Sequence, residues 1–260
     1  MVNSDWGTRC IGGIILDNTQ IPWVVVESGS ILVGSNDRSI LFGGTGPRHE
    51  VNIDYSFRIS ELPLDFKEAV RIVEDTEMEL VSESEWQLAY SRGLISGIDG
   101  TSELLADAAQ DFWGKPCDGR PFVKDRNSPQ IIRRWKSGLA DSLTVFTHRE
   151  SAKPEYGRIR LVIREHSGWS SNPSIIPEKR NTTSIFMEEV LICLFVGVFP
   201  SFVWASFNAS PEYIYEGWLN LILGGIFFSI FTMLFWRPKQ PTWYYESGQM
   251  IPRKGENKPN

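Results

Sequence analysis

Apolar and polar residues are distributed very unevenly along this chain. Two long stretches in its second half, Val190–Phe207 and Trp218–Trp236, contain no charged residue. Each approaches the roughly 20 apolar residues that a helix needs to cross a hydrocarbon core. A buried core helix would have a similar composition, but two such stretches joined by a short polar loop are typical of a membrane hairpin. We therefore predict two transmembrane helices within 185–236.

Three residues within these stretches indicate how the two helices would pack. Pro200 should kink the first helix, because proline cannot donate the helical hydrogen bond and leaves a carbonyl without a partner. Gly224 and Gly225 lie in the second stretch, where the missing side chains would permit a close helix–helix approach. We expect a kinked first helix packed against the second.

The charges around the two stretches predict an orientation. The connecting loop contains Glu212 and Glu216 but neither Lys nor Arg. The outer ends carry the basic residues Lys179, Arg180, Arg237 and Lys239. Because basic residues accumulate on the cytoplasmic side of membrane helices, we predict a multi-pass membrane protein with both ends of the hairpin in the cytoplasm.

Shorter apolar runs, separated by polar turns, occupy the rest of the chain. Alternating apolar residues in Trp23–Ser35, Val51–Ile59 and Gly157–Glu165 predict a strand pair, a half-buried strand and a closing strand. The spacing of apolar residues in Pro63–Thr76 predicts a helix. Strands and helices mix without a regular βαβ rhythm, which predicts the α+β class.

The segment Glu79–Gly93, "ELVSESEWQLAYSRG", has the signals of a complete helix. Ser82 and Glu85 have the spacing of a capping box, and Val81 and Trp86 have the spacing of a hydrophobic staple. Gly93 can supply the left-handed residue that ends a helix. An ordinary amphipathic helix is the simplest interpretation of this pattern.

The same segment resembles the L-P-T-E-A-E-W-E-Y-A-x-R-G signature of the formylglycine-generating enzyme (sulfatase-modifying factor) family. The matching residues are Leu80, Ser82 in place of Thr, Glu83, Glu85, Trp86, Ala89 and, one place late, Arg92 and Gly93. Further matches follow in the family's order: "VESGSILVGS", "GPRHEV", "FRISELPL", "FWG" and "GRIRLV". The resemblance covers about Val26 to Arg164 and implies a reduced C-type-lectin-like fold that lacks one of the family's helices.

The resemblance does not extend to the family's chemistry. Its enzymes carry a cysteine pair that binds copper and activates oxygen, and thiolates are the ligands that Cu(I) prefers. No cysteine occurs between Cys117 and Cys193 in this chain, and the family's G-N-V-W-E-W block is missing. We therefore expect no catalytic residues, no cofactor and no metal site.

These patterns divide the chain into five parts. They are an N-terminal strand extension (1–25), a sulfatase-modifying-factor-like domain (26–165), a linker (166–184), the transmembrane hairpin (185–236) and a polar cytoplasmic tail (237–260).

Composition narrows the classes of partner and site. The chain has 260 residues and a formal net charge of −6, which argues against nonspecific nucleic-acid binding. Its three cysteines are far apart and lack metal-binding spacing. The histidines His49, His148 and His166 are equally dispersed.

One cluster of residue types suggests ligand binding. Arg133, Arg134 and Lys136 flank Trp135, and such a group can hold an anionic or carbohydrate ligand through charge and stacking. We include His49 as a further candidate. The simpler alternatives are a solvated basic face with one packed tryptophan, and a loop histidine bonded to the backbone.

The favoured function is a membrane-anchored noncatalytic module that binds a peptide, protein or small ligand. Its expected partners are the lipid bilayer and a membrane protein or peptide, not nucleic acid. Two alternatives stay open: a membrane-bound, metal-dependent oxidoreductase that modifies a protein residue, and a structural subunit of a membrane complex.

Overall fold

The computed structural model describes residues 10–11, 14–15, 21–75, 77–136, 139–144, 157–166 and 168–254. The chain forms two compact units. The first unit comprises Met1–Val33, Glu50–Gln110 and Pro116–Ser174, and the second comprises Gly34–His49, Asp111–Lys115 and Ile175–Asn260. The described residues mix several sheets with helices, so the α+β class is confirmed. Most of the predicted N-terminal extension, and His148, lie outside the described residues.

A five-stranded sheet forms one part of the first unit. Its strand order is β11-β10-β9-β12-β7, and β12 runs parallel to β9 while the other pairs are antiparallel. The strands are β7 (Leu64–Asp65), β9 (Ser102–Ala108), β10 (Gln130–Lys136), β11 (Leu139–Thr144) and β12 (Gly157–Ile159).

A four-stranded antiparallel sheet forms another part of this unit, in the order β3-β6-β13-β8. The strands are β3 (Trp23–Val26), β6 (Phe57–Ser60), β8 (Glu79–Leu80) and β13 (Leu161–Arg164). The predicted closing strand is therefore two strands, β12 and β13, which belong to different sheets. The chain changes sheets at Arg160, which lies between them.

The other predicted strands also divide between sheets. Trp23–Ser35 forms β3 and β4 (Gly29–Val33), which do not pair with each other, so the expected strand pair is wrong. Val51–Ile59 forms β5 (His49–Ile53) and β6, with a break at 54–56. The alternation itself is correct, because Val51, Ile53, Tyr55, Phe57 and Ile59 are all buried. A further short antiparallel pair is formed by β1 (Cys10–Ile11) and β2 (Ile14–Ile15).

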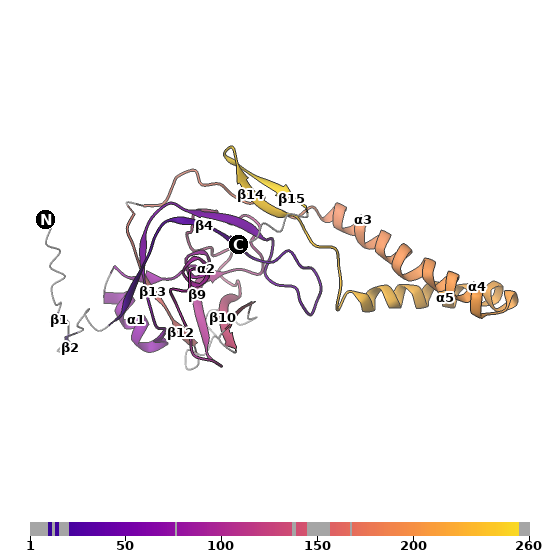
Figure 1. Cartoon of the computed structure of the whole chain (residues 1–260), viewed down its shortest axis with the longest axis horizontal. Helices are drawn as coiled ribbons and strands as arrows, with labels where there is room; N and C mark the ends of the chain where they lie inside the picture. Colours follow the sequence, from indigo (N-terminus) through magenta and orange to yellow (C-terminus); the bar gives the residue numbers. More distant parts are fainter. Residues whose placement is uncertain are drawn as a thin grey trace. The chain divides into compact units, whose positions relative to one another are not determined.

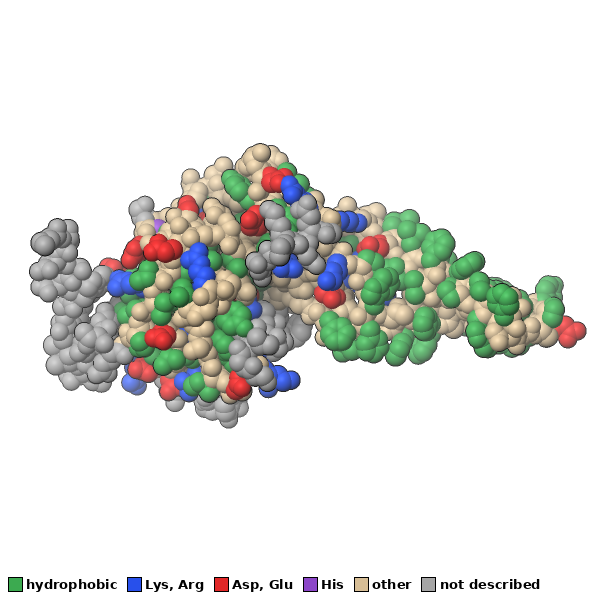
Figure 2. All heavy atoms as spheres, in the orientation of Figure 1, with side chains coloured by type: hydrophobic (Ala, Val, Ile, Leu, Met, Phe, Trp, Pro, Cys, Tyr) green, Lys and Arg blue, Asp and Glu red, His purple; other side chains and the backbone are tan. Residues whose placement is uncertain are grey.

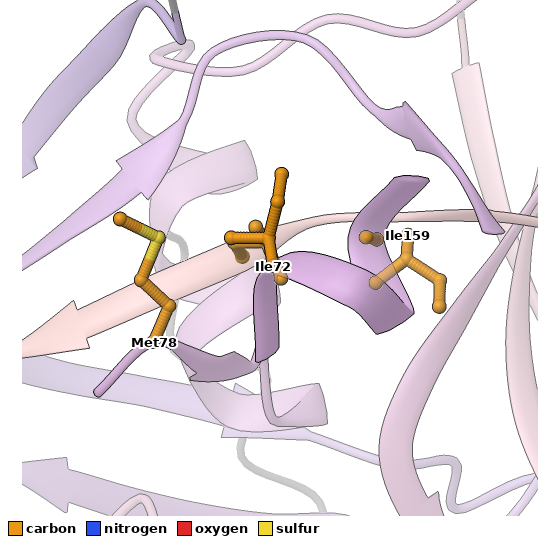
Figure 3. Close-up of a cluster of buried hydrophobic side chains, with 5 residues drawn as sticks. Ile72, Met78 and Ile159 are labelled. Atoms are coloured by element: carbon orange, nitrogen blue, oxygen red, sulfur yellow. The ribbon is translucent and has the colours of Figure 1, made fainter. Parts of the chain in front are cut away.

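The described part of the first unit also contains two helices, α1 (Phe66–Asp75) and α2 (Glu83–Ser91). α1 packs into a hydrophobic cluster of Ala69, Ile72, Met78, Ile159 and Leu161, which is drawn in Figure 3. α2 begins with the predicted capping box, in which the Ser82 hydroxyl accepts from the Glu85 N–H and the Glu85 carboxylate accepts from the Ser82 N–H. Gly93 has a φ of 68°, as its predicted role at the helix end requires.

The second unit contains two helices that are long and apolar enough to cross a membrane, Thr182–Asn208 and Pro211–Thr232. The first is continuous through α3 (Thr182–Ile192), a π-helical segment η2 (Cys193–Val198) and α4 (Phe199–Asn208). The second is α5 (Pro211–Thr232), which runs back alongside the first (Figure 1). α3 thus begins inside the predicted linker.

The expected packing of these helices is partly correct. Gly225 lies against the backbone of the first helix, where an added Cβ would meet the Val198 Cα at 2.6 Å. Its counterpart is Gly197, where an added Cβ would meet the Gly225 carbonyl oxygen at 2.1 Å. Gly224 faces open space instead. The widened π-helical segment directly precedes the turn containing Pro200 and accommodates the residue that lacks an N–H.

The segment after α5 differs from the predicted polar tail. It forms a hairpin of β14 (Thr242–Glu246) and β15 (Gln249–Arg253). Ser247 and Gly248 form its two-residue turn with φ values of 50° and 87°, which suits the right-handed twist of a hairpin. Trp243 in β14 pairs with His49 in β5. The aromatic and β-branched residues of "TWYYE" explain why this segment is a strand.

Candidate functional site

A buried carboxylate of the first unit, Glu103 in β9, accepts four hydrogen bonds. Its Oε2 accepts from Trp86 Nε1 and from Arg160 Nε, both at 2.7 Å. Its Oε1 accepts from Trp135 Nε1 at 2.6 Å and from Arg160 Nη2 at 2.9 Å. Glu103 and Arg160 are both fully buried. The signature residue Trp86 therefore contributes a hydrogen bond as well as apolar area.

Arg160 is held by several backbone carbonyls in addition to Glu103. Its guanidinium also donates to the carbonyl oxygens of Ser60, Glu61 and Ser96. Its five hydrogen bonds match the five N–H groups of a guanidinium. Because a buried charge is tolerated only when it is paired and bonded, this network is built to hold structure.

A second buried carboxylate, Glu85, belongs to the capping box of α2. It accepts from Arg164 Nε at 2.6 Å and from the Tyr55 hydroxyl at 2.8 Å. Burial, together with this carboxylate, raises the pKa of Tyr55 far above its usual value. Burial alone would lower the pKa of Arg164, but Glu85, together with Tyr55 and Glu79, outweighs that effect and raises it. Both groups therefore keep their protons at neutral pH.

The predicted cluster 133–136 is divided between two faces of β10. Arg133 is buried, forms an ion pair with Glu83, and lies over the Trp86 ring at 4.7 Å. Trp135 is only 2% exposed. Arg134 and Lys136 point the other way and are exposed. The expectation that Trp135 stacks on a ligand between basic neighbours is therefore wrong, because strand alternation separates the ring from the two exposed cations.

Aromatic and cationic side chains do meet elsewhere in the first unit. Trp169 is partly exposed, and the guanidinium groups of Arg120 and Arg164 lie over its ring, at 5.5 and 5.3 Å from the ring centre. The rings of Tyr55 and His166 lie at 5.7 and 4.5 Å from it. No sequence motif marks this group, because its members come from distant segments.

His49 lies in the second unit, at the start of β5, and is fully buried. Its Nδ1 lies 2.8 Å from the Pro47 carbonyl oxygen, and its ring contacts Phe112 edge to face. Burial and the nearby Lys115 ammonium lower the pKa of His49 to about 3. The ring is therefore neutral at pH 7, so Nδ1 donates to Pro47, and the buried Nε2 has no hydrogen-bond partner among the residues that the structure describes. His49 bonds to the backbone, as its simpler interpretation predicts, but is not exposed to a ligand.

The base of the helical hairpin carries a compact group of ion pairs. Arg38 forms ion pairs with Glu188 and Glu189 on α3. Arg237, which follows α5, donates to Glu189 from Nε at 2.8 Å, and its other nitrogens reach the Thr232 hydroxyl and the Ser229 carbonyl oxygen. All these residues belong to the second unit. The group fixes both helix ends and the segment that contains Arg38.

Two of the cysteines, Cys117 and Cys193, belong to different units. Cys117 is 2% exposed in the first unit, and Cys193 begins the π-helical segment of the second. Within the described part of the chain, no group of three or more His, Cys, Asp or Glu side chains has a metal-binding arrangement.

Comparisons with known proteins gave no matching family model, no matching curated protein and no matching solved structure.

Proposed function

We propose that this chain is a membrane-anchored, noncatalytic module whose helical hairpin spans the bilayer. The observation that carries the proposal is the surface of the hairpin. Large apolar side chains project from both helices, including Phe207 at 83% and Phe227 at 71% exposure. Figure 2 shows how densely hydrophobic side chains cover the visible face of the hairpin. In water each such side chain would forgo roughly 1.5–3 kcal/mol of burial energy, whereas lipid acyl chains supply that burial.

The length and the ends of the hairpin support the same proposal. The 22 residues of α5 span about 33 Å at 1.5 Å per residue, close to the ~30 Å of a hydrocarbon core. Arg38, Glu188, Glu189 and Arg237 are gathered at one end and paired. Charges are tolerated at a membrane boundary but are costly within it. This end therefore suits a membrane boundary.

The orientation that we propose places both ends of the hairpin in the cytoplasm. A cysteine introduced at position 212 (Glu212→Cys), in a background of Cys10→Ser and Cys193→Ser that retains the buried Cys117, should react with an impermeant maleimide added to intact cells. Glu212 is exposed in the first turn of α5, and its replacement leaves the Ser210 cap intact. The matched variant Gln249→Cys, on β15, should react only after permeabilisation. The opposite pattern would reverse the orientation, and equal labelling of both in intact cells would contradict the membrane anchor.

For the first unit, we propose a degenerate member of the formylglycine-generating enzyme family that retains a C-type-lectin-like scaffold. Support comes from where the matched residues lie. Ser82, Glu83, Glu85, Trp86 and Ala89 are all fully buried, as residues conserving a scaffold would be. Glu83 and Glu85 form ion pairs with Arg133 and Arg164, so both carboxylates are neutralised by partners within the unit. The remaining role is binding a peptide, protein or small ligand at the membrane surface.

We expect no formylglycine formation by this protein. The family's oxidation needs two thiolates around Cu(I), and Cys117, which is buried, is the one cysteine in the sequence between Val26 and Arg164. The full chain in mild detergent, incubated with Cu(I), oxygen and a peptide containing C-x-P-x-R, should leave the peptide mass unchanged. A Cys117→Ser variant is the control. Aldehyde formation that disappears in this variant would overturn the noncatalytic proposal and assign catalysis to Cys117.

A further inference from the structure

The second unit presents an exposed apolar loop outside its helices. Ile40, Leu41 and Phe42 are consecutive, and each is more than half exposed. Isolated exposed apolar residues are common on protein surfaces, but three large ones in sequence at a loop tip are unfavourable in water unless they serve an interaction. We refer to these three residues as the apolar tip.

Backbone hydrogen bonds attach the apolar tip to the end of α5. The Ile40 N–H donates to the Met233 carbonyl oxygen at 3.1 Å, and the Leu41 N–H donates to the Leu234 carbonyl oxygen at 3.0 Å. These carbonyls follow the last residue of α5 and have no partner within the helix, as at any helix C-terminus. The tip is therefore held at the level of the helix end.

The rest of the loop fixes which way the tip faces. The Ser35 N–H donates to the Thr45 carbonyl oxygen at 2.8 Å and closes the loop, and Asp37 accepts from the Ser39 N–H and hydroxyl. The Arg38 side chain is buried against Glu188 and Glu189 of the hairpin. The polar side of the loop is thus occupied by the hairpin, which leaves the tip facing outward.

We infer that the apolar tip inserts into the interfacial layer of the bilayer, beside the end of α5. This inference rests on the proposed membrane anchor. Phe235 and Trp236, which follow the carbonyls that hold the tip, are each about half exposed. Tryptophan is typical of the membrane–water interface, so it marks the expected depth of the tip. The bonded N–H groups of Ile40 and Leu41 remove the polar groups that would oppose entry into an apolar layer.

The apolar tip continues the exposed apolar surface of α5, which favours lipid over a protein as its binding partner. The apolar tip is bonded to the same helix that exposes Phe227 and Phe228 along its length, so one membrane contacts both without a change of conformation. A protein partner or a second copy of the chain would instead have to bind at the edge of the lipid-facing surface.

The test measures the depth of the tip in vesicles of phosphatidylcholine and phosphatidylglycerol that contain the full chain. A nitroxide is attached to a cysteine at position 42 (Phe42→Cys), in the background of Cys10→Ser and Cys193→Ser. Phe42 is chosen because its replacement leaves the hydrogen bonds of Ile40 and Leu41 in place. Labels at Phe227→Cys, in mid-helix, and at Ile98→Cys, an exposed apolar loop residue of the first unit, are the matched controls.

The depth of each nitroxide is obtained from its collision rates with oxygen, which concentrates in lipid, and with a water-soluble nickel chelate. We expect an oxygen-to-nickel ratio at position 42 several-fold above that at 98 and below that at 227. A ratio at 42 equal to that at 98, with 227 in lipid, would overturn the inference and leave the membrane anchor intact. A label at 42 shielded from both reagents would also overturn it, in favour of a protein contact. An aqueous ratio at 227 would overturn the membrane anchor itself.

Discussion

Replacing Glu103 with alanine should destabilise the first unit by at least about 3–5 kcal/mol, the usual cost of removing one partner from a buried ion pair. The reason is that Arg160 would keep its charge in the protein interior without a counterion. The Trp86 and Trp135 indoles would also lose the acceptor of their N–H groups. Each buried donor left unsatisfied costs roughly 1–3 kcal/mol, although such costs do not add simply.

The measurement is thermal unfolding of the full chain in mild detergent, with hydrogen exchange followed in peptides from β9 and β10. Glu103→Gln fills nearly the same space and isolates the contribution of the charge. Glu165→Ala is the matched control, because its ion pair with Arg58 has a separation of 3.8 Å and the Glu165 side chain is 54% exposed. Such surface pairs contribute less than about 1 kcal/mol. Equal effects of Glu103→Ala and Glu165→Ala would show that the buried network does not stabilise the unit.

Replacing Gly225 with alanine should separate the two helices of the hairpin. The new Cβ would lie 2.6 and 2.7 Å from the Val198 Cα and N, and these backbone atoms cannot move away by rotating a side chain. Overpacking of this kind typically costs about 1–3 kcal/mol. We expect a lower unfolding temperature in detergent, and a lower yield of disulfide cross-linking between Ser201→Cys and Leu221→Cys, sites now joined by a 2.8 Å hydrogen bond.

The adjacent residue provides a matched control. An added Cβ at Gly224 would meet nothing within 4 Å, so Gly224→Ala should leave both measurements unchanged. The two variants have the same composition and nearly the same helix propensity. If they behave alike, the close approach at Gly225 is not what holds the helices together.

Local signals explain why parts of the fold could be predicted from the sequence. The capping box of α2 involves residues three positions apart, and Gly93 directly follows the helix it ends. The two apolar helices are equally evident, since length and composition define them. The division of strands between sheets could not be predicted from the sequence. The break in the strand after Ile53 and the change of sheet at Arg160 depend on pairing with strands that are distant in the sequence.

Part of the candidate site could be predicted from the sequence. A two-residue period along β10 already separates Arg133 and Trp135 from Arg134 and Lys136, and applying it would have corrected the expected ligand cluster. Glu103 gives no such signal. A glutamate in a strand normally indicates the solvent face, and its partner Arg160 lies 57 residues further along the chain. A single sequence contains no pattern that would indicate an ion pair between residues so far apart.

The position of Arg160 also constrains the order of events during synthesis. Its acceptors lie between 57 and 100 residues upstream, so Glu103 has no counterion until the chain has been made to residue 160. The first apolar helix begins soon afterwards, at Thr182. The nascent first unit therefore completes its interior only as the two long apolar helices are themselves being synthesised. Folding of the first unit and synthesis of the two apolar helices are therefore neighbouring steps in time.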